Sequence, residues 1–439
     1  MKKILILGAG LVSRPLVKYL LDRGIKLLVA SRTVSKAEDL IEGHPDGEAL
    51  AFDIVKNPSL LDELVPRVDL VISLLPYTYH VQVAEACLRF KKHMVTTSYV
   101  SEKMDSLNNR AKEAKVILLN EIGVDPGIDH MSAMKVIHHV QKNGGKIKSF
   151  RSYCGGLPAP DANTKPFGYK FSWSPRGVLM AGKNSARYLE DGKEVFIPGE
   201  ELFDHYKLIN IEGVGELEGY PNRNSLPYIE KYGIRETETM FRGTFRYPGW
   251  CRTLKKIAET GYLKEEKIDG LSELTFRGLT SMLTGLSHKN LKHDLTLRLD
   301  IEEDSLVMHN LEWLGLLSDE SIPENEKTPL DVLVARMLQK LQYERGERDM
   351  LILYHEFIAH YKDRKEKITS TLIDFGIPHG DSSMSRTVGL PAAIASRFIL
   401  EGKFNMSGVV IPVIPEIYEP VLKELEGLNI VCKEKYYQI

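Results

Sequence analysis

Short apolar runs alternate with amphipathic segments over the first part of the chain. Six of these runs are typical of strands: KILILG, KLLVAS, EALAFDI, DLVISLLP, HMVTTSY and VILLNEIG. The segments between them place apolar residues at helical spacing: LVSRPLVKYLLDRG, NPSLLDELV, HVQVAEACLRF and SEKMDSLNNRAKEAK. Nearly continuous apolar strands separated by helices predict a parallel sheet covered on both faces. Such sheets bind ligands at the carboxyl ends of their strands.

The pattern then changes along the rest of the chain. VDPGIDHMSAMKVIHHVQKNGG predicts one helix, with Asp125 as its cap, Pro126 in its first turn and Gly144 at its end. Short strands with Gly and Pro turns follow, and then a helical stretch from about Cys251 to Tyr343. MLILYHEFIAHY and KITSTLIDFG predict a hairpin around the charged KDRKEK.

These patterns predict an α/β protein whose parts follow one another along the chain. We expect a Rossmann-type doubly wound parallel sheet over residues 1–125, with the segment from about 385 to 439 packed back onto it. A mixed α/β substrate domain is expected over residues 126–250 and 345–384, and a small helical domain over residues 251–344.

A glycine turn follows the first predicted strand. In GAGLVS, Gly8 permits a tight turn and Gly10 allows the backbone to approach a pyrophosphate, while Ser13 stands where a third glycine is usual. The amides of Leu11 and Val12 would then face the anion at the start of the helix. A turn that needs two glycines without any ligand is the alternative, but the alternating unit that follows favours a dinucleotide site.

The second predicted strand ends in Ser31, Arg32 and Thr33. An NAD site usually presents an acid at this place, to hold the ribose hydroxyls. An arginine would instead bind a 2'-phosphate through charge-assisted hydrogen bonds, and the two hydroxyls could donate to the same phosphate. The sequence therefore predicts NADP(H), with a solvated surface arginine as the alternative.

Composition narrows the class of protein further. The chain has 439 residues and a formal net charge of -2, which indicates no bulk attraction for nucleic acid or anionic lipid. The four cysteines form no C-x-x-C pair, which is typical of a reducing compartment and predicts neither a disulfide framework nor a structural zinc site. HEFIAH lacks the spacing of a zinc helix, so we expect no metal. No apolar stretch could cross a bilayer and no signal cleavage site follows the first strand, so we expect a cytoplasmic protein.

Motifs spread through the whole chain resemble one family. They are LDRGIKLLVASRT, VISLLPYTYH, VTTSYVS, NEIGVDPGIDH, SYCGGLPAP, GYKFSWSPRG, YPNR, RGTFRYPG, ERDM and TVGLPAAIA. In this order they are similar to the saccharopine reductases, the NADP-dependent, glutamate-forming saccharopine dehydrogenases of the aminoadipate route to lysine. The resemblance implies that 2-aminoadipate 6-semialdehyde and L-glutamate condense to an imine, which NADPH reduces reversibly to saccharopine. It also implies a homodimer.

The resemblance assigns roles to individual residues. It implies cofactor contacts from Gly8, Ala9, Gly10, Leu11, Val12, Ser31, Arg32, Thr33, Asp53, Ile54, Leu75, Thr97, Ser98, Val124, Asp125, Pro126 and Ser174. It implies substrate contacts from Ser98, Tyr99, Asp125, Arg223, Thr244, Phe245 and Arg246. Arginines suit a substrate with three carboxylates because the planar guanidinium matches the carboxylate. The catalytic proton could come from Asp125, Cys154, Tyr99 or a bound water, and the sequence does not choose between them.

Each of these assignments has a structural alternative. Asp125 could only cap a helix, Cys154 could be an inert core residue, and the two arginines could form ordinary salt bridges. Two other functions remain open as well. One is a related imine reductase for another amine and semialdehyde, as in carboxynorspermidine formation, and the other is a non-catalytic NADP-binding regulator. Arg223 and Arg246 favour the substrate with more carboxylates.

Overall fold

The computed structural model describes residues 2–439, which divide into two compact units. The first unit comprises the chain up to Ile147 together with Leu353–Ile439, and the second comprises Lys148–Ile352. The C-terminal segment expected to return to the first domain thus belongs to the same unit as the first strands. The helices of residues 251–344 belong to the second unit, together with its strands.

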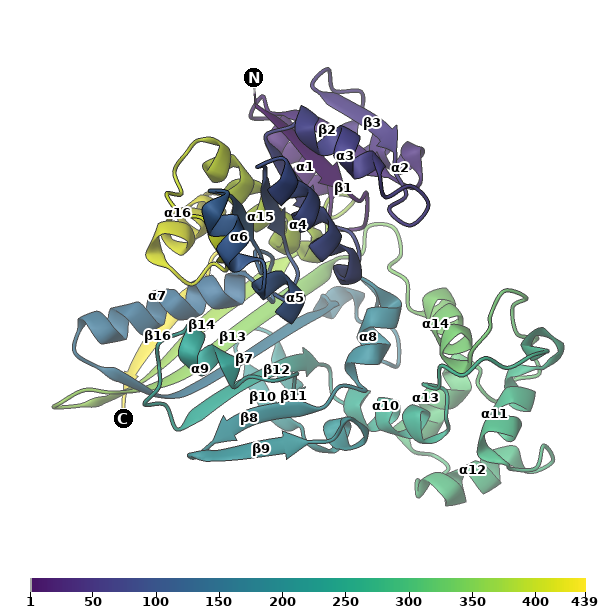
Figure 1. The fold of residues 1–439 in the computed structure, drawn as a ribbon. Helices are drawn as coiled ribbons and strands as arrows, with labels where there is room; N and C mark the ends of the chain where they lie inside the picture. Colours follow the sequence, from purple (N-terminus) through teal and green to yellow (C-terminus); the bar gives the residue numbers. More distant parts are fainter. Residues whose placement is uncertain (1) are drawn as a thin grey trace. The chain divides into compact units, whose positions relative to one another are not determined.

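The first unit contains a seven-stranded sheet in the order β15-β6-β5-β4-β1-β2-β3, and all its pairings are parallel. Figure 1 labels β1, β2 and β3 of this sheet. The strands are β1 (Lys3–Leu7), β2 (Lys26–Ser31), β3 (Gly47–Ala51), β4 (Leu70–Ser73), β5 (His93–Thr96), β6 (Ile117–Leu119) and β15 (Gly408–Val410). The six strands predicted from apolar runs are therefore confirmed. The chain order reverses between β1 and β4, and such a switch point is where open parallel sheets bind ligands.

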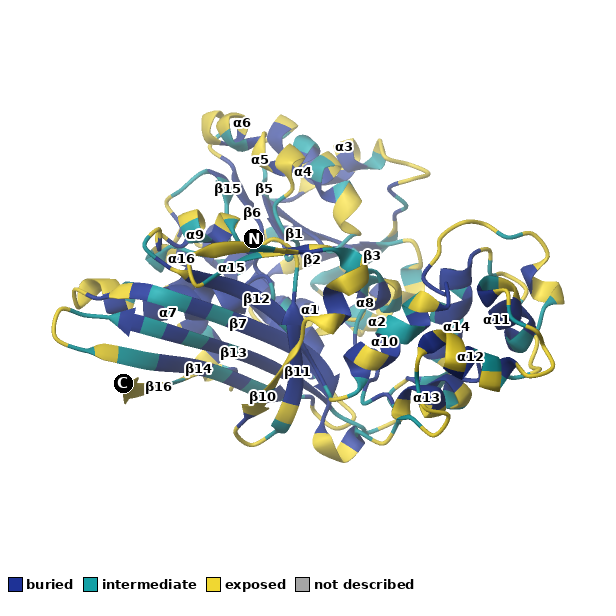
Figure 2. Ribbon diagram, turned by 90° about the horizontal axis from the view of Figure 1, so that it is seen from below, coloured by how far each residue is buried: buried dark blue, intermediate teal, exposed yellow. Residues whose placement is uncertain are grey.

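Helices cover both faces of this sheet. They are α1 (Arg14–Leu21), α2 (Val34–Ile41), α3 (Leu60–Leu64), α4 (His80–Arg89), α5 (Glu102–Asp105), α6 (Asn108–Glu113) and α15 (Ser383–Leu400). The unit also contains α7 (Ile128–Lys142) and α16 (Pro415–Gly427), which pack on each other. Leu5 and Leu7 of β1 share a buried core with α3, α4, α5 and α6, while α1 and α15 pack on each other and on the sheet. Side chains alternate between the faces of a strand, so Ile4 and Ile6 point to the other side, and all four are fully buried. Figure 2 shows the strands of the molecule mainly in the colour of buried residues.

Helix α7 begins at Ile128, so the expectation that Asp125 caps it is wrong. Its N-cap is Gly127, whose N–H donates to Asp129 Oδ1 at 2.5 Å. Gly127 has φ +147, and a Cβ there would lie 2.1 Å from the carbonyl oxygen of Gly123. Because of this close turn, the helix starts only at Ile128, and Asp125 and Pro126 lie in a loop after β6. In this loop the Asp125 side chain accepts a hydrogen bond from Tyr99.

The second unit contains a mixed sheet and most of the remaining helices. β12 pairs in parallel with β7 and antiparallel with β11, which pairs antiparallel with β10; β8 pairs with β12 and β9. The strands are β7 (Lys146–Pro158), β8 (Ala186–Glu190), β9 (Lys193–Ile197), β10 (Lys207–Ile211), β11 (Gly215–Pro221) and β12 (Thr239–Arg246). The helices are α8 (Pro175–Ala181), α9 (Pro227–Lys231), α10 (Trp250–Glu259), α11 (Phe276–Thr284), α12 (Leu291–Leu299), α13 (Leu306–Leu314) and α14 (Pro329–Lys340).

The predicted hairpin forms from two long strands. β13 (Asp349–His360) and β14 (Lys365–Phe375) are joined by a turn in which Tyr361 N–H donates to Arg364 O at 2.8 Å. β14 also pairs antiparallel with β16 (Lys433–Gln438). HEFIAH lies within β13, as a strand rather than a helix, so His355 and His360 face opposite sides.

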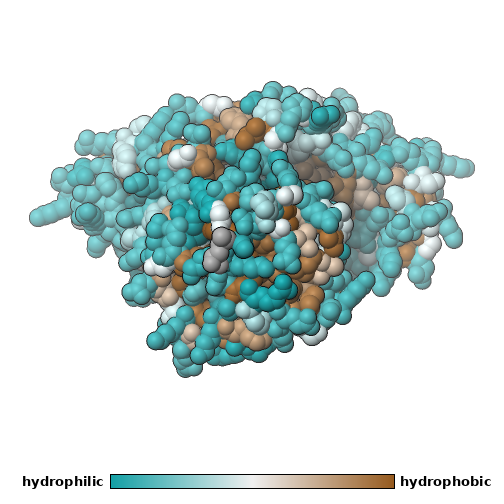
Figure 3. Space-filling view, turned by 90° about the horizontal axis from the view of Figure 1, so that it is seen from above, coloured by the Kyte–Doolittle hydropathy of each residue, from teal (hydrophilic) through white to brown (hydrophobic). Residues whose placement is uncertain are grey.

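One face of the molecule is mainly polar. Figure 3 shows a face with mostly hydrophilic residues and smaller apolar areas between them. None of the helices formed by residues 2–439 combines the length and the hydropathy needed to span a bilayer. No three side chains of the His, Cys, Asp or Glu type are grouped to hold a metal ion in this part of the chain.

The contact between α15 and the glycine turn gives a first testable prediction. A Cβ at Gly389 of α15 would lie 2.7 Å from the carbonyl oxygen of Val12 and 3.3 Å from the Cβ of Leu16. Gly389→Ala should therefore lower the free energy of unfolding by about 1–3 kcal/mol, because the added methyl overpacks this contact. Urea unfolding monitored by circular dichroism measures the change. Gly427→Ala at the end of α16 is the matched control, because no atom lies within 4 Å of a Cβ there among residues 2–439. Equal effects of the two substitutions would contradict the close approach.

Candidate functional site: a dinucleotide turn, a Tyr99–Asp125 pair and a buried guanidinium

The turn between β1 and α1 is held together by its own residues. The Gly8 N–H donates to Ala30 O at 2.8 Å, and Gly8 has φ +114, which favours glycine. The Ser13 hydroxyl accepts from Gly10 N–H at 3.1 Å and donates to Gly8 O at 3.3 Å. Ser13 thus occupies the place of the third glycine and closes the turn with its side chain.

The turn leaves backbone donors free. The amides of Leu11 and Val12 have no hydrogen-bond acceptor among residues 2–439, and they precede Ser13, the N-cap of the short helix α1. A Cβ at Gly10 would meet no atom of the described chain within 4 Å, so one side of the turn is open. Unpaired N–H groups at a helix start form the environment that a phosphate prefers. The residues present therefore fit the pyrophosphate of a dinucleotide.

The end of β2 provides a second anion environment in the same unit. Arg32 is exposed and has no ion pair among the described residues. Thr33 is the N-cap of α2, and its side chain makes no bond to the helix amides, while its N–H donates to Ser31 Oγ at 3.3 Å. Lys36 of α2, which was not predicted from the sequence, is also exposed and lacks an ion pair in residues 2–439.

Two further predicted residues follow β3, and one follows β4. Asp53 Oδ1 accepts from the N–H groups of Val55 at 2.9 Å and Lys56 at 3.3 Å, so its side chain shapes the turn after β3. Ile54 is buried and Leu75 is half-buried. Their contact with the cofactor stays a prediction.

Tyr99 and Asp125 form a direct pair. They follow β5 and β6, and the Tyr99 hydroxyl donates to Asp125 Oδ1 at 2.8 Å. Both residues are half-buried. The structure thus brings two of the three predicted catalytic residues together, with a phenolic hydroxyl beside a carboxylate.

Buried charged groups brace the segments that carry this pair. The Val100 N–H donates to Glu121 Oε1 at 3.0 Å, and Glu121 Oε2 lies 2.8 Å from His130 Nε2 on α7. Glu121 and His130 are both buried, so each needs the other as a polar partner. This contact ties the loop after β5 to the start of α7. Sequence reasoning did not find it, because nothing in NEIGVDPGIDH marks these side chains as buried.

Arg246 is the most distinctive residue of the second unit. It lies at the end of β12 with 4% of its surface exposed. Its Nη1 donates to Phe245 O at 2.7 Å, and its Nε has no hydrogen-bond partner among residues 2–439. The guanidinium carbon lies 5.0 Å from the centre of the Tyr169 ring and 5.4 Å from that of Trp250. A role for these two aromatic residues was not predicted from the sequence. Tyr169 lies in the family motif GYKFSWSPRG, and Trp250 directly follows the motif RGTFRYPG.

No carboxylate within the described chain lies within 4.0 Å of this guanidinium. Glu218 is the residue opposite Arg246 across β11 and β12. Its carboxylate instead accepts from the N–H groups of Gly249 at 2.7 Å and Cys251 at 2.8 Å, at the start of α10. Burial lowers the pKa of Arg246, but neighbouring groups, led by the Tyr220 phenol, raise it above its ordinary value, so the side chain is charged. A buried cation without an anion is unfavourable, so an incoming carboxylate would stabilise it.

The other predicted residues of the second unit occupy varied positions. Arg223 is exposed in the turn after β11, with φ +56, and Thr244 is half-buried on β12 beside Cys154 of β7. Phe245 is fully buried and stacks on Tyr153, with 4.9 Å between ring centres. Cys154 itself is buried, and the Ser174 hydroxyl accepts from Gly177 N–H as the cap of α8. A cofactor contact of Ser174 stays a prediction beside this capping role.

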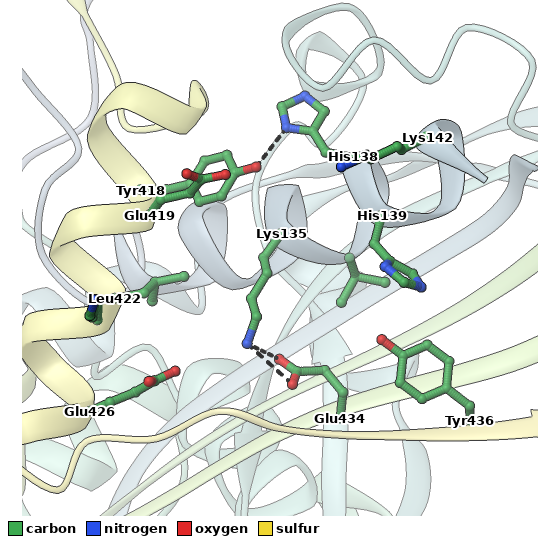
Figure 4. Close-up of a pocket in the computed structure, with 12 residues that line it drawn as sticks. Lys135, His138, His139, Lys142, Tyr418, Glu419, Leu422, Glu426, Glu434 and Tyr436 are labelled. Carbon is green, nitrogen blue, oxygen red and sulfur yellow. Dashed lines mark hydrogen bonds and ion pairs between the residues drawn. The ribbon is translucent and has the colours of Figure 1, made fainter. Parts of the chain in front are cut away.

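A cavity of about 490 Å³ lies elsewhere in the first unit and contains none of the predicted site residues. It is formed by α7, α16 and β16 (Figure 4). Lys135 Nζ lies 3.3 Å from both carboxylate oxygens of Glu434, and His138 Nδ1 lies 2.9 Å from the Tyr418 hydroxyl. These polar groups pair with one another, so the cavity does not resemble the anion sites described above.

Comparisons with known proteins agree along the whole chain. Residues 4–119 match the family described as saccharopine dehydrogenase NADP binding domain, and residues 123–430 match the saccharopine dehydrogenase C-terminal domain. The chain is 42% identical over 447 residues to saccharopine dehydrogenase [NADP(+), L-glutamate-forming] of Pyricularia oryzae, with 99% of each chain covered. It is 37% identical to mitochondrial alpha-aminoadipic semialdehyde synthase of Bos taurus, covering 98% of this chain and 47% of that protein.

A solved structure extends this likeness to the fold. Apo saccharopine dehydrogenase (L-Glu forming) from Saccharomyces cerevisiae superposes with a TM-score of 0.90 at 40% identity, and the match covers 100% of both chains. The predicted fold class, a parallel dinucleotide-binding sheet with a second, mixed sheet, is thereby confirmed. The chain belongs to the saccharopine dehydrogenase family.

Proposed function

We propose that this protein catalyses the reversible, NADPH-dependent joining of 2-aminoadipate 6-semialdehyde and L-glutamate to give saccharopine, in lysine metabolism through aminoadipate. The observation that carries the proposal is the buried guanidinium of Arg246, which has no carboxylate partner in residues 2–439. A substrate with several carboxylates provides the anion that this position lacks. The end-to-end likeness to glutamate-forming saccharopine dehydrogenases supports the same reaction.

NADP(H) is the cofactor. The free amides of Leu11 and Val12 would hold its pyrophosphate, and Arg32 with Ser31 and Thr33 would hold its 2'-phosphate. The bound nicotinamide supplies the hydride for reduction and accepts it in the reverse direction. The side chains of the protein would carry out the proton transfers and bind the substrate.

The pair Tyr99–Asp125 suits the proton transfers of this reaction. Imine formation requires the loss of water, and the imine must be protonated before reduction. The Asp125 carboxylate would bind the ammonium group of the amine, and the Tyr99 hydroxyl, 2.8 Å from Asp125 Oδ1, orients that carboxylate. Cys154 is the other candidate for the proton, and it lies buried beside Thr244.

Substrate carboxylates would be bound by the second unit. Arg246 offers its unpaired Nε, and Phe245 holds it in place through the bond from Nη1 to its carbonyl oxygen. The rings of Tyr169 and Trp250 flank the guanidinium and limit its movement. Arg223 and Thr244 are proposed to bind a second carboxylate.

We further propose that the protein acts in the cytoplasm as a homodimer. All four cysteines are free thiols, which is typical of a reducing compartment. The dimer rests on the family resemblance.

Arg32→Ala should weaken NADPH binding by about 10- to 100-fold and leave NADH binding unchanged, because only the first cofactor carries a 2'-phosphate. Calorimetric titration of both cofactors measures the two affinities. The control is Arg298→Ala in α12, another exposed arginine without an ion pair in residues 2–439. An equal loss for NADPH and NADH would rule out the role of Arg32.

Arg246→Met should weaken substrate binding without lowering the free energy of unfolding. The substitution removes a buried charge that has no carboxylate partner in the described chain, so the free energy of unfolding should stay equal or increase. The KM for saccharopine should rise by about 10- to 100-fold, because a charge-assisted hydrogen bond to a carboxylate is lost. Absorbance of NADPH formed from saccharopine and NADP⁺ measures the KM. A variant that is less stable but keeps its KM would show that Arg246 is structural.

Asp125→Ala should lower kcat by about 100-fold or more, because the amine loses its carboxylate and the proton path is broken. Tyr99→Phe should have a smaller effect, since the carboxylate remains and loses only the bond from the Tyr99 hydroxyl. The same saccharopine assay measures both, and circular dichroism establishes that each variant is folded. Normal turnover by folded Asp125→Ala would exclude the role of Asp125.

A further inference from the structure

His80 occupies a buried position at the ligand-binding edge of the parallel sheet. It is the first residue of α4, follows β4 after a short turn, and has 4% of its surface exposed. The function described above does not use it, and in the sequence it was identified only as part of the family motif VISLLPYTYH and as the start of the predicted helical segment HVQVAEACLRF. The neighbouring strand β5 ends at Thr96, so the segment that leads to Tyr99 passes close to the ring.

Three hydroxyl groups surround the imidazole. His80 Nδ1 lies 2.9 Å from Ser73 Oγ, at the end of β4. On the other side, His80 Nε2 lies 2.8 Å from Ser98 Oγ and 3.1 Å from Thr96 Oγ1. No carboxylate within residues 2–439 lies within 4.0 Å of the ring, so His80 has no ion pair.

The ring is uncharged under ordinary conditions. Burial lowers the pKa of His80 to about 4. A neutral imidazole has one N–H and one lone pair, so one nitrogen donates and the other accepts. Ser73 occupies one nitrogen, and the other is left for Thr96 and Ser98.

Ser98 is thereby held from two directions. Its carbonyl oxygen accepts from Glu121 N–H at 3.0 Å, and its hydroxyl is bonded to His80. The bond to His80 selects one rotamer of Ser98. If Nε2 carries the proton, the Ser98 hydroxyl accepts from it and its own hydrogen is left for another acceptor; if Nδ1 carries the proton, the Ser98 hydroxyl can donate to Nε2. Ser98 is half-buried, so part of it remains accessible at the carboxyl end of β5.

We propose that His80 is a positioning residue that fixes the Ser98 hydroxyl so that it can orient the nicotinamide ring for hydride transfer. The proposal rests on the function proposed above, in which Ser98 contacts the cofactor. Most of the affinity for NADPH would come from the phosphate contacts at the glycine turn and Arg32, far along the cofactor from its reacting end. Loss of the His80 contact should therefore affect the geometry of the reaction more than the binding of the cofactor.

The main experiment compares His80→Leu with His80→Gln. Leucine removes both hydrogen-bonding nitrogens, whereas glutamine keeps one donor and one acceptor. We expect His80→Leu to lower kcat about tenfold or more while the KM for NADPH changes less than about threefold. His80→Gln should recover most of the lost kcat. The matched control is His355→Leu, because His355 is also buried in the first unit and its Nε2 lies 2.8 Å from the Ser132 hydroxyl.

A binding measurement tests the same contact without turnover. Adenosine 2',5'-bisphosphate carries phosphate groups but no nicotinamide, and it should bind the wild type and the His80 variants equally. NADPH should lose a small part of its affinity in His80→Leu, and this loss should be absent when Ser98 is already alanine. Calorimetric titration gives both affinities.

A double-mutant cycle decides whether His80 acts through Ser98. If it does, His80→Leu should change kcat by less than about twofold in the Ser98→Ala background. Effects of His80→Leu and Ser98→Ala that multiply independently would overturn the proposal. So would a His80→Leu variant that is less stable, like His355→Leu, but keeps the wild-type kcat.

Two further variants keep the test decisive if His80→Leu does not fold. Ser73→Ala removes the hydroxyl on the opposite side of the ring, and it should lower kcat only when Ser98 is intact. His80→Gln should keep most of the kcat of the protein with the same residue at position 98, whether that residue is serine or alanine. If the wild-type protein does not convert saccharopine with NADP⁺, the proposed function itself is wrong. The calorimetric titrations with NADPH and adenosine 2',5'-bisphosphate would still test the contact between His80 and Ser98.

Discussion

The first unit depends on one geometric constraint, which is that all strands of its sheet run in the same direction. Every strand therefore ends at the same edge, and the chain leaves that edge in a turn each time. The glycine turn follows β1, the Ser31–Thr33 segment closes β2, and the segments with Tyr99 and Asp125 follow β5 and β6. Residues far apart in the sequence are gathered at one edge because the strands are parallel, and His80 is added to them at the start of α4.

Buried polar groups determine which side chains are available for chemistry. Glu218 lies opposite Arg246, yet its carboxylate is bound by the first amides of α10. The helix start satisfies the acid, and the guanidinium is left without a carboxylate in the described chain. In the first unit, Glu121 and His130 satisfy each other and support the loop of Asp125. Both observations follow from the rule that buried polar groups need partners. Arg246 is left able to bind a substrate carboxylate, and the Glu121–His130 pair stabilises the loop that carries Asp125.

Several features could be predicted from the sequence because they depend on near neighbours along the chain. The alternation of apolar strands and helices predicted the parallel sheet, and GAGLVS and Ser31–Thr33 predicted an anion site for NADP(H). Asp125 was assigned to a helix cap, and this was wrong because the close approach of Gly127 to Gly123 moves the helix start to Ile128. That approach is a contact within a folded loop, and the residue types do not reveal it.

The sequence alone determined the order of elements, the glycine turn and the basic end of β2, because local spacing and side-chain type are sufficient for these. Only the tertiary structure decided that Tyr99 bonds to Asp125, that Arg246 lacks a carboxylate and that His80 holds Ser98. These properties depend on which side chains are buried and which polar groups already have partners. Burial and pairing are set by strands and helices that meet across long sequence separations, and no local pattern encodes them.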